Sequence, residues 1–394
     1  NVRGGDVPRT PFPLGFALLH ADGHVDLYMD QRKVPARTIA WLGNAVTLAP
    51  VDALGPALDA LGAAKARVLV EGATAPVWAA NRLQAAGVTL VREADPVALP
   101  KAAKNDVELQ GIRAAHRRDG AAVSRFLCWL ARESASGTLR EIAVSDRLQA
   151  ERQETGALRD LSFDTISGAG PNGAIVHYHA TPATERLLEP GSLYLVDSGG
   201  QYRDGTTDIT RTVAIGTPSP EMRDRFTRVL KGHIALAMAR FPAGTTGSQL
   251  DVLARYALWQ AGLDYDHGTG HGVGAYLSVH EGPHRISKMP NAVALEPGMI
   301  VSNEPGYYKA GAYGIRIENL VAVREATIEG ADRRYLEFET LTLAPIDLAC
   351  VEPALLTEPE RRWLNDYHRR VRETVAPQVD AATREWLATA TRAI

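Results

Sequence analysis

Acidic residues interrupt a stretch of the sequence that otherwise has the pattern of two paired β-strands. The stretch reads LYLVDSGGQYRDGTTDITRTVAIG, and residues 193–196 and 209–215 have strand-forming side chains. Aspartate is rare in strands because its side chain competes for backbone hydrogen bonds and is costly to bury without a partner. Asp204 precedes a glycine, which is typical of a tight turn. Asp197 and Asp208 need another explanation; the first could cap a turn and the second could pair with Arg211.

Further acids and histidines occur in strand-like segments later in the chain. HGTGHGVGAYLSVHEGP contains His267, His271 and His280, MIVSNEPGYY contains Glu304, and YGIRIENLVAV contains Glu318. A carboxylate moved from water into apolar surroundings must be paired, protonated or bound to a metal. Taken alone, Glu318 could simply pair with Arg316, and a lone histidine such as His177 in IVHYH could be an ordinary core or surface residue.

Several converging carboxylates repel one another unless a cation lies among them. Four acids and one imidazole supply enough oxygen and nitrogen donors for two divalent ions that share bridging carboxylates. The pattern therefore predicts a two-metal site of Asp197, Asp208, Glu304 and Glu318 with one of the histidines.

Composition excludes several classes of partner. The 394 residues carry 43 basic and 46 acidic side chains, a formal net charge of −3, so we expect neither nucleic-acid nor membrane binding. Cys128 and Cys350 lie far apart next to apolar residues, which favours buried free thiols and a reducing compartment. Without a long apolar run or a signal peptide at the start, the sequence predicts a cytoplasmic protein.

The pattern of apolar residues predicts two domains, with a boundary near Pro100. Residues 1–99 alternate short strands with Ala/Leu-rich helices and indicate a small α/β unit. Residues 100–394 indicate an α+β domain with an antiparallel sheet. In it we expect helices at 106–133, 138–155, 219–240 and 246–261, strands around 163–166 and 174–178, and a strand-rich stretch over 263–346. Asp106 could cap the first helix, and Thr357 with Glu360 predicts a capping box before a C-terminal helix.

Two local motifs are misleading. Gly168-x-Gly170-x-x-Gly173 has the spacing of a dinucleotide-binding loop, but Pro171 interrupts it and a strand-like segment rather than a helix follows. His267 and His271 have the spacing of a zinc-binding helix, but the glycines around them exclude a stable helix. Neither a nucleophile elbow nor a phosphate-binding loop is present in the sequence.

The ordered set Asp, Asp, His, Glu, Glu resembles the pita-bread metallopeptidases, which include methionine aminopeptidase, prolidase and aminopeptidase P. Four flanking segments are more specific: GPNGAIVHYH, DSGGQYRDGTTDITRT, HGTGHGVGAYLSVHEGP and NEPGYY…GIRIEN are similar to the cytosolic, multidomain Xaa-Pro aminopeptidases. The resemblance covers nearly the whole chain. It implies a pita-bread catalytic domain over 100–394, preceded over 1–99 by part of a creatinase N-terminal-like domain.

The resemblance also implies a role for each matching residue. Asp197 and Asp208 would bind one metal, Asp208 and Glu318 would bridge both, and His271 and Glu304 would complete the other. Manganese is the usual family ion, and zinc or cobalt also fits such ligands. The remaining positions are catalytic or substrate-binding: His177 and His280 at the tetrahedral intermediate, His267 near the proline pocket, and Tyr308 and Arg316 behind the ligands, with Arg316 orienting Glu318.

The implied reaction is hydrolysis of the first peptide bond of Xaa-Pro peptides by a hydroxide that bridges the two metals, with Glu304 moving the proton. A homodimer is expected by resemblance alone. Relatives carry a further N-terminal domain and a longer middle domain, so the sequence would be a fragment of a three-domain protein, or a protein without that first domain. Three alternatives remain: a prolidase that cuts only Xaa-Pro dipeptides, a non-catalytic interaction module, and a creatinase-like hydrolase that needs no metal.

Overall fold

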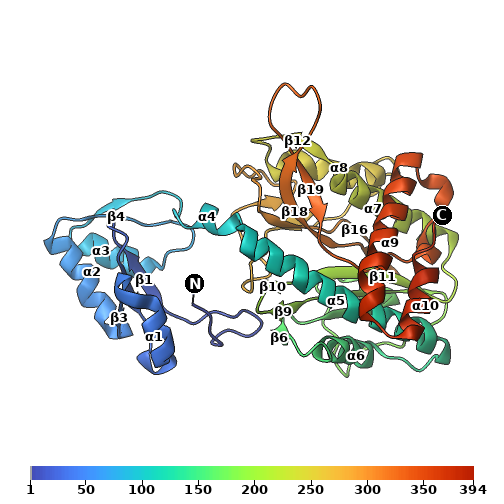
Figure 1. The fold of residues 1–394 in the computed structure, drawn as a ribbon, viewed down its shortest axis with the longest axis horizontal. Coiled ribbons are helices and arrows are strands. Elements are labelled where there is room, and N and C mark those ends of the chain that lie inside the picture. The colour runs from blue at the N-terminus through green and yellow to red at the C-terminus, as the bar shows by residue number, and fades with distance from the viewer. Residues whose placement is uncertain (1) are drawn as a thin grey trace. The chain divides into compact units, whose positions relative to one another are not determined.

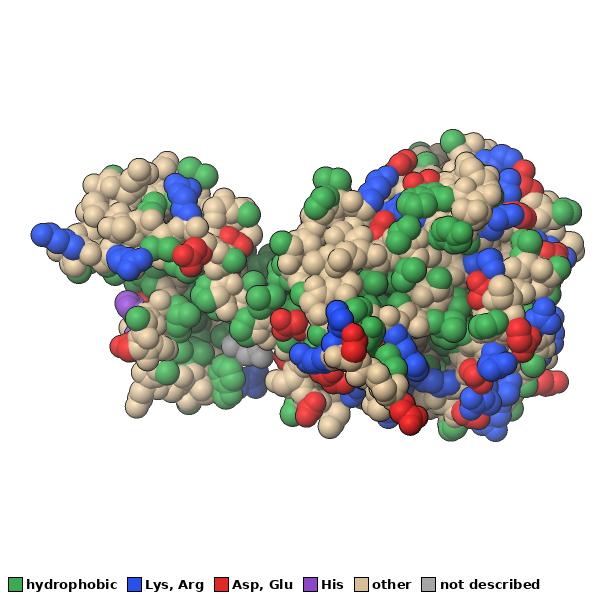
Figure 2. Space-filling view, turned by 90° about the horizontal axis from the view of Figure 1, so that it is seen from above, with side chains coloured by type: hydrophobic (Ala, Val, Ile, Leu, Met, Phe, Trp, Pro, Cys, Tyr) green, Lys and Arg blue, Asp and Glu red, His purple; other side chains and the backbone are tan. Residues whose placement is uncertain are grey.

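The structure has two units, and the first of them ends at Pro100. The computed structural model describes residues 2–394, and it divides into Asn1–Pro100 and Lys101–Ile394 (Figure 1). Among the described helices, none is long and apolar enough to cross a lipid bilayer. Figure 2 shows acidic and basic side chains interspersed over one face of the larger unit. This face therefore lacks the continuous positive charge that attracts nucleic acids.

The first unit is a small α/β structure. Its strands form one sheet in the order β1-β2-β3 and a parallel pair of β4 and β5. Leu54 and Leu58 of one helix and Leu83 of another are buried together beneath the strands. The elements are β1 (Phe16–Leu19), β2 (Val25–Tyr28), α1 (Ala36–Leu42), β3 (Val46–Ala49), α2 (Leu54–Ala63), β4 (Arg67–Leu69), α3 (Val77–Ala85) and β5 (Thr89–Val91). The helix α4 (Ala98–Ala102) follows at the boundary.

The second unit places helices around small antiparallel sheets (Figure 1). Its helices are α5 (Asp106–Glu133), α6 (Glu141–Gln153), α7 (Pro220–Ala237), α8 (Gly247–Trp259), α9 (Glu358–Val375) and α10 (Ala381–Ala390). Its first strands are β6 (Leu158–Leu161), β7 (Ile166–Ala169), β8 (Ser192–Ser198), β9 (Gly200–Tyr202), β10 (Gly205–Thr206) and β11 (Ile209–Ile215). The later strands are β12 (Arg240–Pro242), β13 (Gly270–His271), β14 (Arg285–Ile286), β15 (Ile300–Asn303), β16 (Gly306–Lys309), β17 (Tyr313–Arg316), β18 (Asn319–Ala326) and β19 (Tyr335–Thr340).

Two antiparallel sheets carry the site. One has the order β11-β8-β7 and the other β12-β19-β18-β15, and β16 pairs with β17 as a separate hairpin. In the first sheet Thr210 lies directly opposite Asp197. Phe226, Leu230 and Ile234 of α7 are fully buried in the core that covers the strands. The strands are therefore fixed from behind by apolar packing, and their polar residues lie at strand ends.

Capping boxes begin the helices α5 and α9, but the capping residue predicted for α5 was wrong. The cap of α5 is Asn105, not Asp106, because the Asn105 side chain accepts from the backbone N–H of Glu108 while the Glu108 carboxylate accepts from the Asn105 N–H. Asp106 is the first helical residue, where its charge is favourable at the positive end of the helix dipole. The capping box of Thr357 and Glu360 is confirmed.

Two predicted strands are wrong. Residues 163–166 lie mostly in the connection between β6 and β7, and residues 174–178 contain no strand. Gly170–Ala174 instead forms a 3-10 helix, with Gly170 at φ +51°. Pro171 cannot donate to a strand ladder, so this apolar segment leaves the sheet. The segment after Gly173 is thus an irregular loop, and His177 lies in it.

Both cysteines are buried and free, as predicted. A buried ion pair also crosses the helical layer: Arg152 of α6, which is fully buried, donates through Nε to Asp119 of α5 at 2.8 Å. Tyr202 of β9 donates to the same carboxylate at 2.7 Å. The pair therefore ties two helices to a strand inside the core.

We expect Arg152→Met to lower the free energy of unfolding by about 3–5 kcal/mol, because it leaves the Asp119 carboxylate buried without its cation. The measurement is chemical denaturation of both proteins. Arg333→Met is the control, because Arg333 pairs with Asp332 at the surface and its loss should leave the midpoint unchanged. Equal midpoints for Arg152→Met and the unaltered protein would contradict the assigned role of the buried pair.

Candidate active site

Strand ends converge on one cavity and bring the five predicted metal ligands together. Asp197 lies on β8, Asp208 directly precedes β11, His271 ends β13, Glu304 follows β15, and Glu318 lies between β17 and β18. All five line a cavity of about 460 Å³. The other predicted site residues that line it are His177, His267, His280 and Arg316. Tyr308 does not line the cavity but lies behind it, where it contacts His267 and Arg316.

The imidazole of His271 lies between two of the carboxylates. Its Nε2 is 3.5 Å from Oδ2 of Asp208 and 3.4 Å from Oε1 of Glu304. Its Nδ1 is 2.9 Å from the carbonyl oxygen of Gly272, which can only accept, so the proton belongs on Nδ1. In the neutral ring that a metal binds, the lone pair of Nε2 therefore points into the group of acids. Ligand atoms of Asp208, His271 and Glu318 all lie within 4.8 Å of one another.

The carboxylates are buried more deeply than isolated anions tolerate. Asp197, Asp208 and Glu318 expose 8%, 3% and 1% of their surface. Burial raises the pKa of Asp208 to about 6 and that of Glu304 to about 7, and it raises the pKa of Glu318 well above its ordinary value. The Oδ1 atoms of Asp197 and Asp208 are buried and have no hydrogen-bond partner among the described residues. Unsatisfied anionic oxygens facing one imidazole are the donor set that a divalent cation requires.

Arg316 is the permanent positive charge beside the site. Its guanidinium donates to Oδ2 of Asp197 at 2.6 Å, to the Tyr308 hydroxyl at 2.6 Å and to Oγ1 of Thr210 at 3.2 Å. The Thr210 hydroxyl in turn donates to Glu318 at 2.8 Å. The sequence interpretation that Arg316 orients Glu318 therefore needs correction, because its direct carboxylate partner is Asp197 and its connection to Glu318 runs through Thr210.

Arg211 does not pair with Asp208. It is fully buried, and its guanidinium donates to the carbonyl oxygen of Glu318 at 2.6 Å and to Oδ1 of Asn319 at 2.8 Å. The alternative explanation of Asp208 as a simple ion-pair partner is thereby removed. The Asp204 side chain lies in the turn between β9 and β10 and pairs with Arg118 at 2.6 Å.

The remaining histidines differ in what they can donate. Both ring nitrogens of His267 are engaged: Nδ1 with the Gly268 carbonyl oxygen at 2.8 Å and Nε2 with the Tyr308 hydroxyl at 2.8 Å. Burial and the charge of Arg316 lower its pKa to about 3, so its ring is neutral. His280 packs edge-on against His271, with ring centroids 4.2 Å apart, and burial with the charge of His271 lowers its pKa to about 4.

Sequence reasoning missed the apolar wall of the cavity. Phe163, Ile166 and Val176 line it, and so does Met289 from a distant segment. They are ordinary apolar residues in the sequence, and only the fold brings them to one side. Thr210 was also missed, although its position opposite Asp197 follows once the register of the β8 and β11 pair is known.

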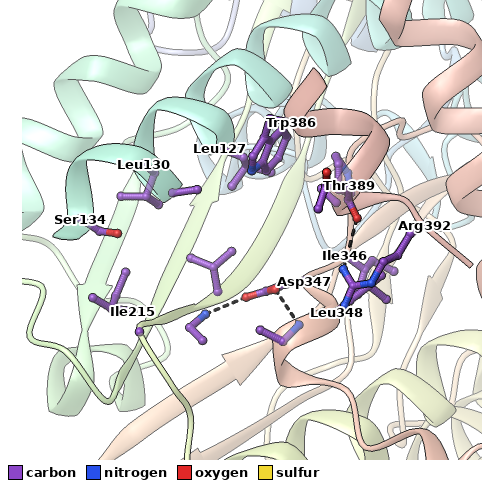
Figure 3. Close-up of a pocket in the computed structure, with 17 residues that line it drawn as sticks. Leu127, Leu130, Ser134, Ile215, Ile346, Asp347, Leu348, Trp386, Thr389 and Arg392 are labelled. Atoms are coloured by element: carbon purple, nitrogen blue, oxygen red, sulfur yellow. Dashed lines mark hydrogen bonds between the residues drawn. The ribbon is translucent and has the colours of Figure 1, made fainter. Parts of the chain in front are cut away.

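A second cavity, of about 360 Å³, lies elsewhere in the unit among α5, β11 and α10. Figure 3 shows Leu127, Leu130 and Trp386 around it. Its acidic residue, Asp347, already accepts from the backbone N–H groups of Ala214 and Ala349, both at 2.9 Å. It lacks the unsatisfied converging acids of the first cavity, so the first is the candidate active site.

The fold and this group of acids define a class, the pita-bread metallopeptidases, as the sequence predicted. The family model for metallopeptidase family M24 matches residues 110–325, the model for the C-terminal region of that family matches 334–394, and the creatinase/prolidase N-terminal domain matches 1–108. The chain belongs to metallopeptidase family M24.

Several known proteins of this family are similar to the chain over nearly its whole length. A probable Xaa-Pro aminopeptidase P of Laccaria bicolor is 44% identical over 399 residues, covering 98% of this chain and 61% of its own length. Aminopeptidase P2 of Arabidopsis thaliana is 43% identical, covering 100% of this chain and 60% of its own. The X-prolyl aminopeptidase structure from Caenorhabditis elegans, described as a cytosolic enzyme with a di-nuclear active site, has a TM-score of 0.93 at 37% identity and covers 100% of this chain and 65% of that one. The chain thus spans less than two thirds of the length of these relatives.

A solved Xaa-Pro dipeptidase from Bacillus anthracis is also similar. Its TM-score is 0.70 at 25% sequence identity, and the match covers 85% of this chain and 89% of that one. The shared fold therefore includes proteins named as aminopeptidases and as dipeptidases.

Metal binding should stabilise the protein more at high pH than at low pH. The pKa of Glu304 rises from 4.5 to about 7 on folding. Burial lowers the pKa of His271, but contact with Asp208 and the charge of Glu304 outweigh it and raise the value from 6.5 to about 9. Both groups hold protons more tightly when folded, so metal-free protein loses stability as pH rises from roughly 4.5 to 9. Bound cations remove that loss because they replace the protons.

We therefore expect the rise in Tm on adding manganese to chelator-treated protein to be small near about pH 5 and large near about pH 8. Differential scanning fluorimetry at both pH values measures it. A rise of equal size at the two values would show that these acids do not bind the ion.

Arg316→Met should weaken metal binding by about 10- to 100-fold, because the Asp197 carboxylate loses the donor that orients it. Isothermal titration with manganese measures the affinity. Arg324→Met is the matched control, since Arg324 pairs with Glu337 at the exposed end of β18. Unchanged affinity in Arg316→Met would contradict the orienting role.

Proposed function

We propose that the protein is an aminopeptidase that binds two divalent ions and hydrolyses the first peptide bond of substrates with proline in the second position. The observation that carries the proposal is the convergence of four carboxylates, three of them buried, and the Nε2 of His271 on one cavity. The relatives named probable Xaa-Pro aminopeptidase P and aminopeptidase P2, at 44% and 43% identity, support the substrate class.

The ligands in this proposal are Asp197, Asp208, His271, Glu304 and Glu318. Hard oxygen donors with one imidazole fit manganese, and zinc or cobalt is compatible with the same set. When bound, two such ions lower the pKa of a water molecule so that it becomes a nucleophile near neutral pH.

Glu304 carries the proton during the reaction. It lies at the end of β15 with Oε1 directed at His271 and held by the Ser302 hydroxyl at 3.1 Å. From there it takes the proton from the attacking water and delivers it to the prolyl nitrogen, which has no proton of its own in the peptide. That nitrogen then leaves as an amine and the N-terminal residue is released.

The histidines act on the scissile carbonyl and on the prolyl ring. His177 and His280 donate N–H groups to the oxygen on which negative charge develops, and the low pKa of His280 keeps it neutral before the step. His267 has no free ring nitrogen, so its contribution is its ring, held by Tyr308 as one wall of the cavity. Phe163, Ile166 and Val176 supply the apolar contacts that suit a proline side chain.

A dipeptidase is the second candidate, because the similar structure from Bacillus anthracis is a Xaa-Pro dipeptidase. Substrate length separates the two. Purified protein supplied with manganese should cleave an Xaa-Pro-Xaa tripeptide and release the first residue, as followed by mass spectrometry. Cleavage of Xaa-Pro dipeptides alone would establish the dipeptidase, and two bound metals without cleavage of either would favour an interaction module.

Glu304→Gln should lower kcat by about 10²- to 10⁴-fold, because the amide cannot accept the proton from water. Steady-state kinetics with the tripeptide gives kcat, and metal analysis of the same sample shows whether ligation survives. A variant that keeps two metals and full kcat would remove Glu304 from the proton transfer.

A cytoplasmic location and a homodimer belong to the same proposal. The location is supported by the Caenorhabditis elegans relative, described as cytosolic, and by the two free buried thiols. The dimer is supported by the family resemblance alone, and light scattering of the purified protein tests it.

A further inference from the structure

A buried carboxylate outside the metal site organises the loop that carries His177. Glu141 is the first residue of α6 and is completely buried. It does not line the cavity of the five ligands, and its hydrogen-bond partners lie in the segment 167–186, which contains none of them. Neither the proposed reaction nor the metal site uses it.

The carboxylate of Glu141 accepts hydrogen bonds from four groups of one loop. Oε1 accepts from the backbone N–H of Ala169 at 2.7 Å and from the side-chain amide of Asn172 at 3.0 Å. Oε2 accepts from the Tyr178 hydroxyl at 2.9 Å and from the backbone N–H of Arg186 at 3.0 Å. These donors are uncharged, and they come from both ends and the middle of the loop, so one side chain fixes its path.

Tyr178 connects this carboxylate to the active site. Its ring is buried with Ile166 and Leu195, and Tyr308 packs against the same group. Its chain neighbour His177 is exposed and lines the cavity. The loop has no strand pairing from 174 to 178, so bonds of the Tyr178 hydroxyl to Glu141, Asn172 and Thr184 help to hold it instead.

We propose that Glu141, acting through Tyr178, is the positioning residue for His177. The carboxylate holds the Tyr178 ring in place, and this sets where the imidazole of His177 enters the cavity. The inference rests on the proposed function in that His177 acts on the substrate. The loop geometry itself can be tested without activity.

The sharpest variant is Tyr178→Phe, which deletes one hydroxyl and keeps the ring. With manganese-loaded protein and an Xaa-Pro-Xaa tripeptide, we expect kcat to fall about 10- to 100-fold while KM changes by less than about twofold, as for a misplaced catalytic group. Metal content should stay the same. Glu141→Gln should lower kcat in the same direction, because its amide NH₂ faces donors where an oxygen accepted.

The matched control is Tyr202→Phe. Tyr202 is also buried and also donates its hydroxyl to a buried carboxylate, that of Asp119, but among the described residues its side chain forms no hydrogen bond with the loop 169–186. Its loss should leave kcat unchanged even if it lowers stability. An equal fall of kcat in both variants would show a general folding effect and overturn the proposal.

A double-mutant cycle separates positioning from an independent role. In the His177→Ala background, Tyr178→Phe should cause no further loss of kcat, because the group that it positions is already gone. Multiplicative losses would overturn the proposal.

Hydrogen exchange gives a readout that does not depend on catalysis. Amides of residues 174–186 should exchange faster in Tyr178→Phe than in the unaltered protein, and at an unchanged rate in Tyr202→Phe. Faster exchange in a protein that cleaves no Xaa-Pro peptide would support the positioning of the loop by Glu141 and contradict the proposed function. Unchanged exchange in this loop would contradict the positioning role of Glu141, whatever the activity of the variant.

Discussion

Electrostatic repulsion among buried carboxylates is the constraint on which the second unit depends. Asp197, Asp208, Glu304 and Glu318 line one cavity, all but Glu304 are buried, and like charges in such surroundings cost several kcal/mol unless they are compensated. The structure supplies the Arg316 guanidinium at Asp197 and the imidazole of His271, and bound cations would supply the rest. Rigid backbone pairing keeps these groups from moving apart. The backbone N–H of Glu318, for example, donates to the Thr210 carbonyl oxygen at 3.1 Å.

A polar network behind the ligands adds to this rigidity. His233 of α7 is fully buried, and its Nδ1 lies 3.1 Å from the carbonyl oxygen of Asn303. Its Nε2 lies 3.0 Å from the side-chain amide of Asn319. These two asparagines are the chain neighbours of Glu304 and Glu318. Burial and the charge of Arg211 lower the pKa of His233 to about 3, so a neutral ring connects the two ligand strands.

The sequence predicts those parts of the site in which chemistry and regular structure coincide. Asp197 and Asp208 are conspicuous because they stand where a strand should continue, and the strands on both sides of them form as expected. The partner of Arg316 could not be read from the sequence, since Asp197 is distant in the chain and only the packing of β17 against β8 brings the two together. The strand predicted at residues 174–178 was wrong because an apolar run has the same composition in a strand as in a loop packed on the core. Glu141 gave no signal, because an acid at the start of a helix is ordinary and its burial depends entirely on tertiary structure.

The two kinds of backbone around the cavity have different tolerance to evolutionary change. The metal ligands lie on or beside hydrogen-bonded strands, where an insertion shifts register and moves several ligands at once. His177 lies on an irregular loop whose path is fixed by side chains, chiefly the Glu141 carboxylate. Such a loop can lengthen, shorten or exchange residues without disturbing the ladder. That loop can therefore change in sequence and length while the positions of the five predicted ligands are retained.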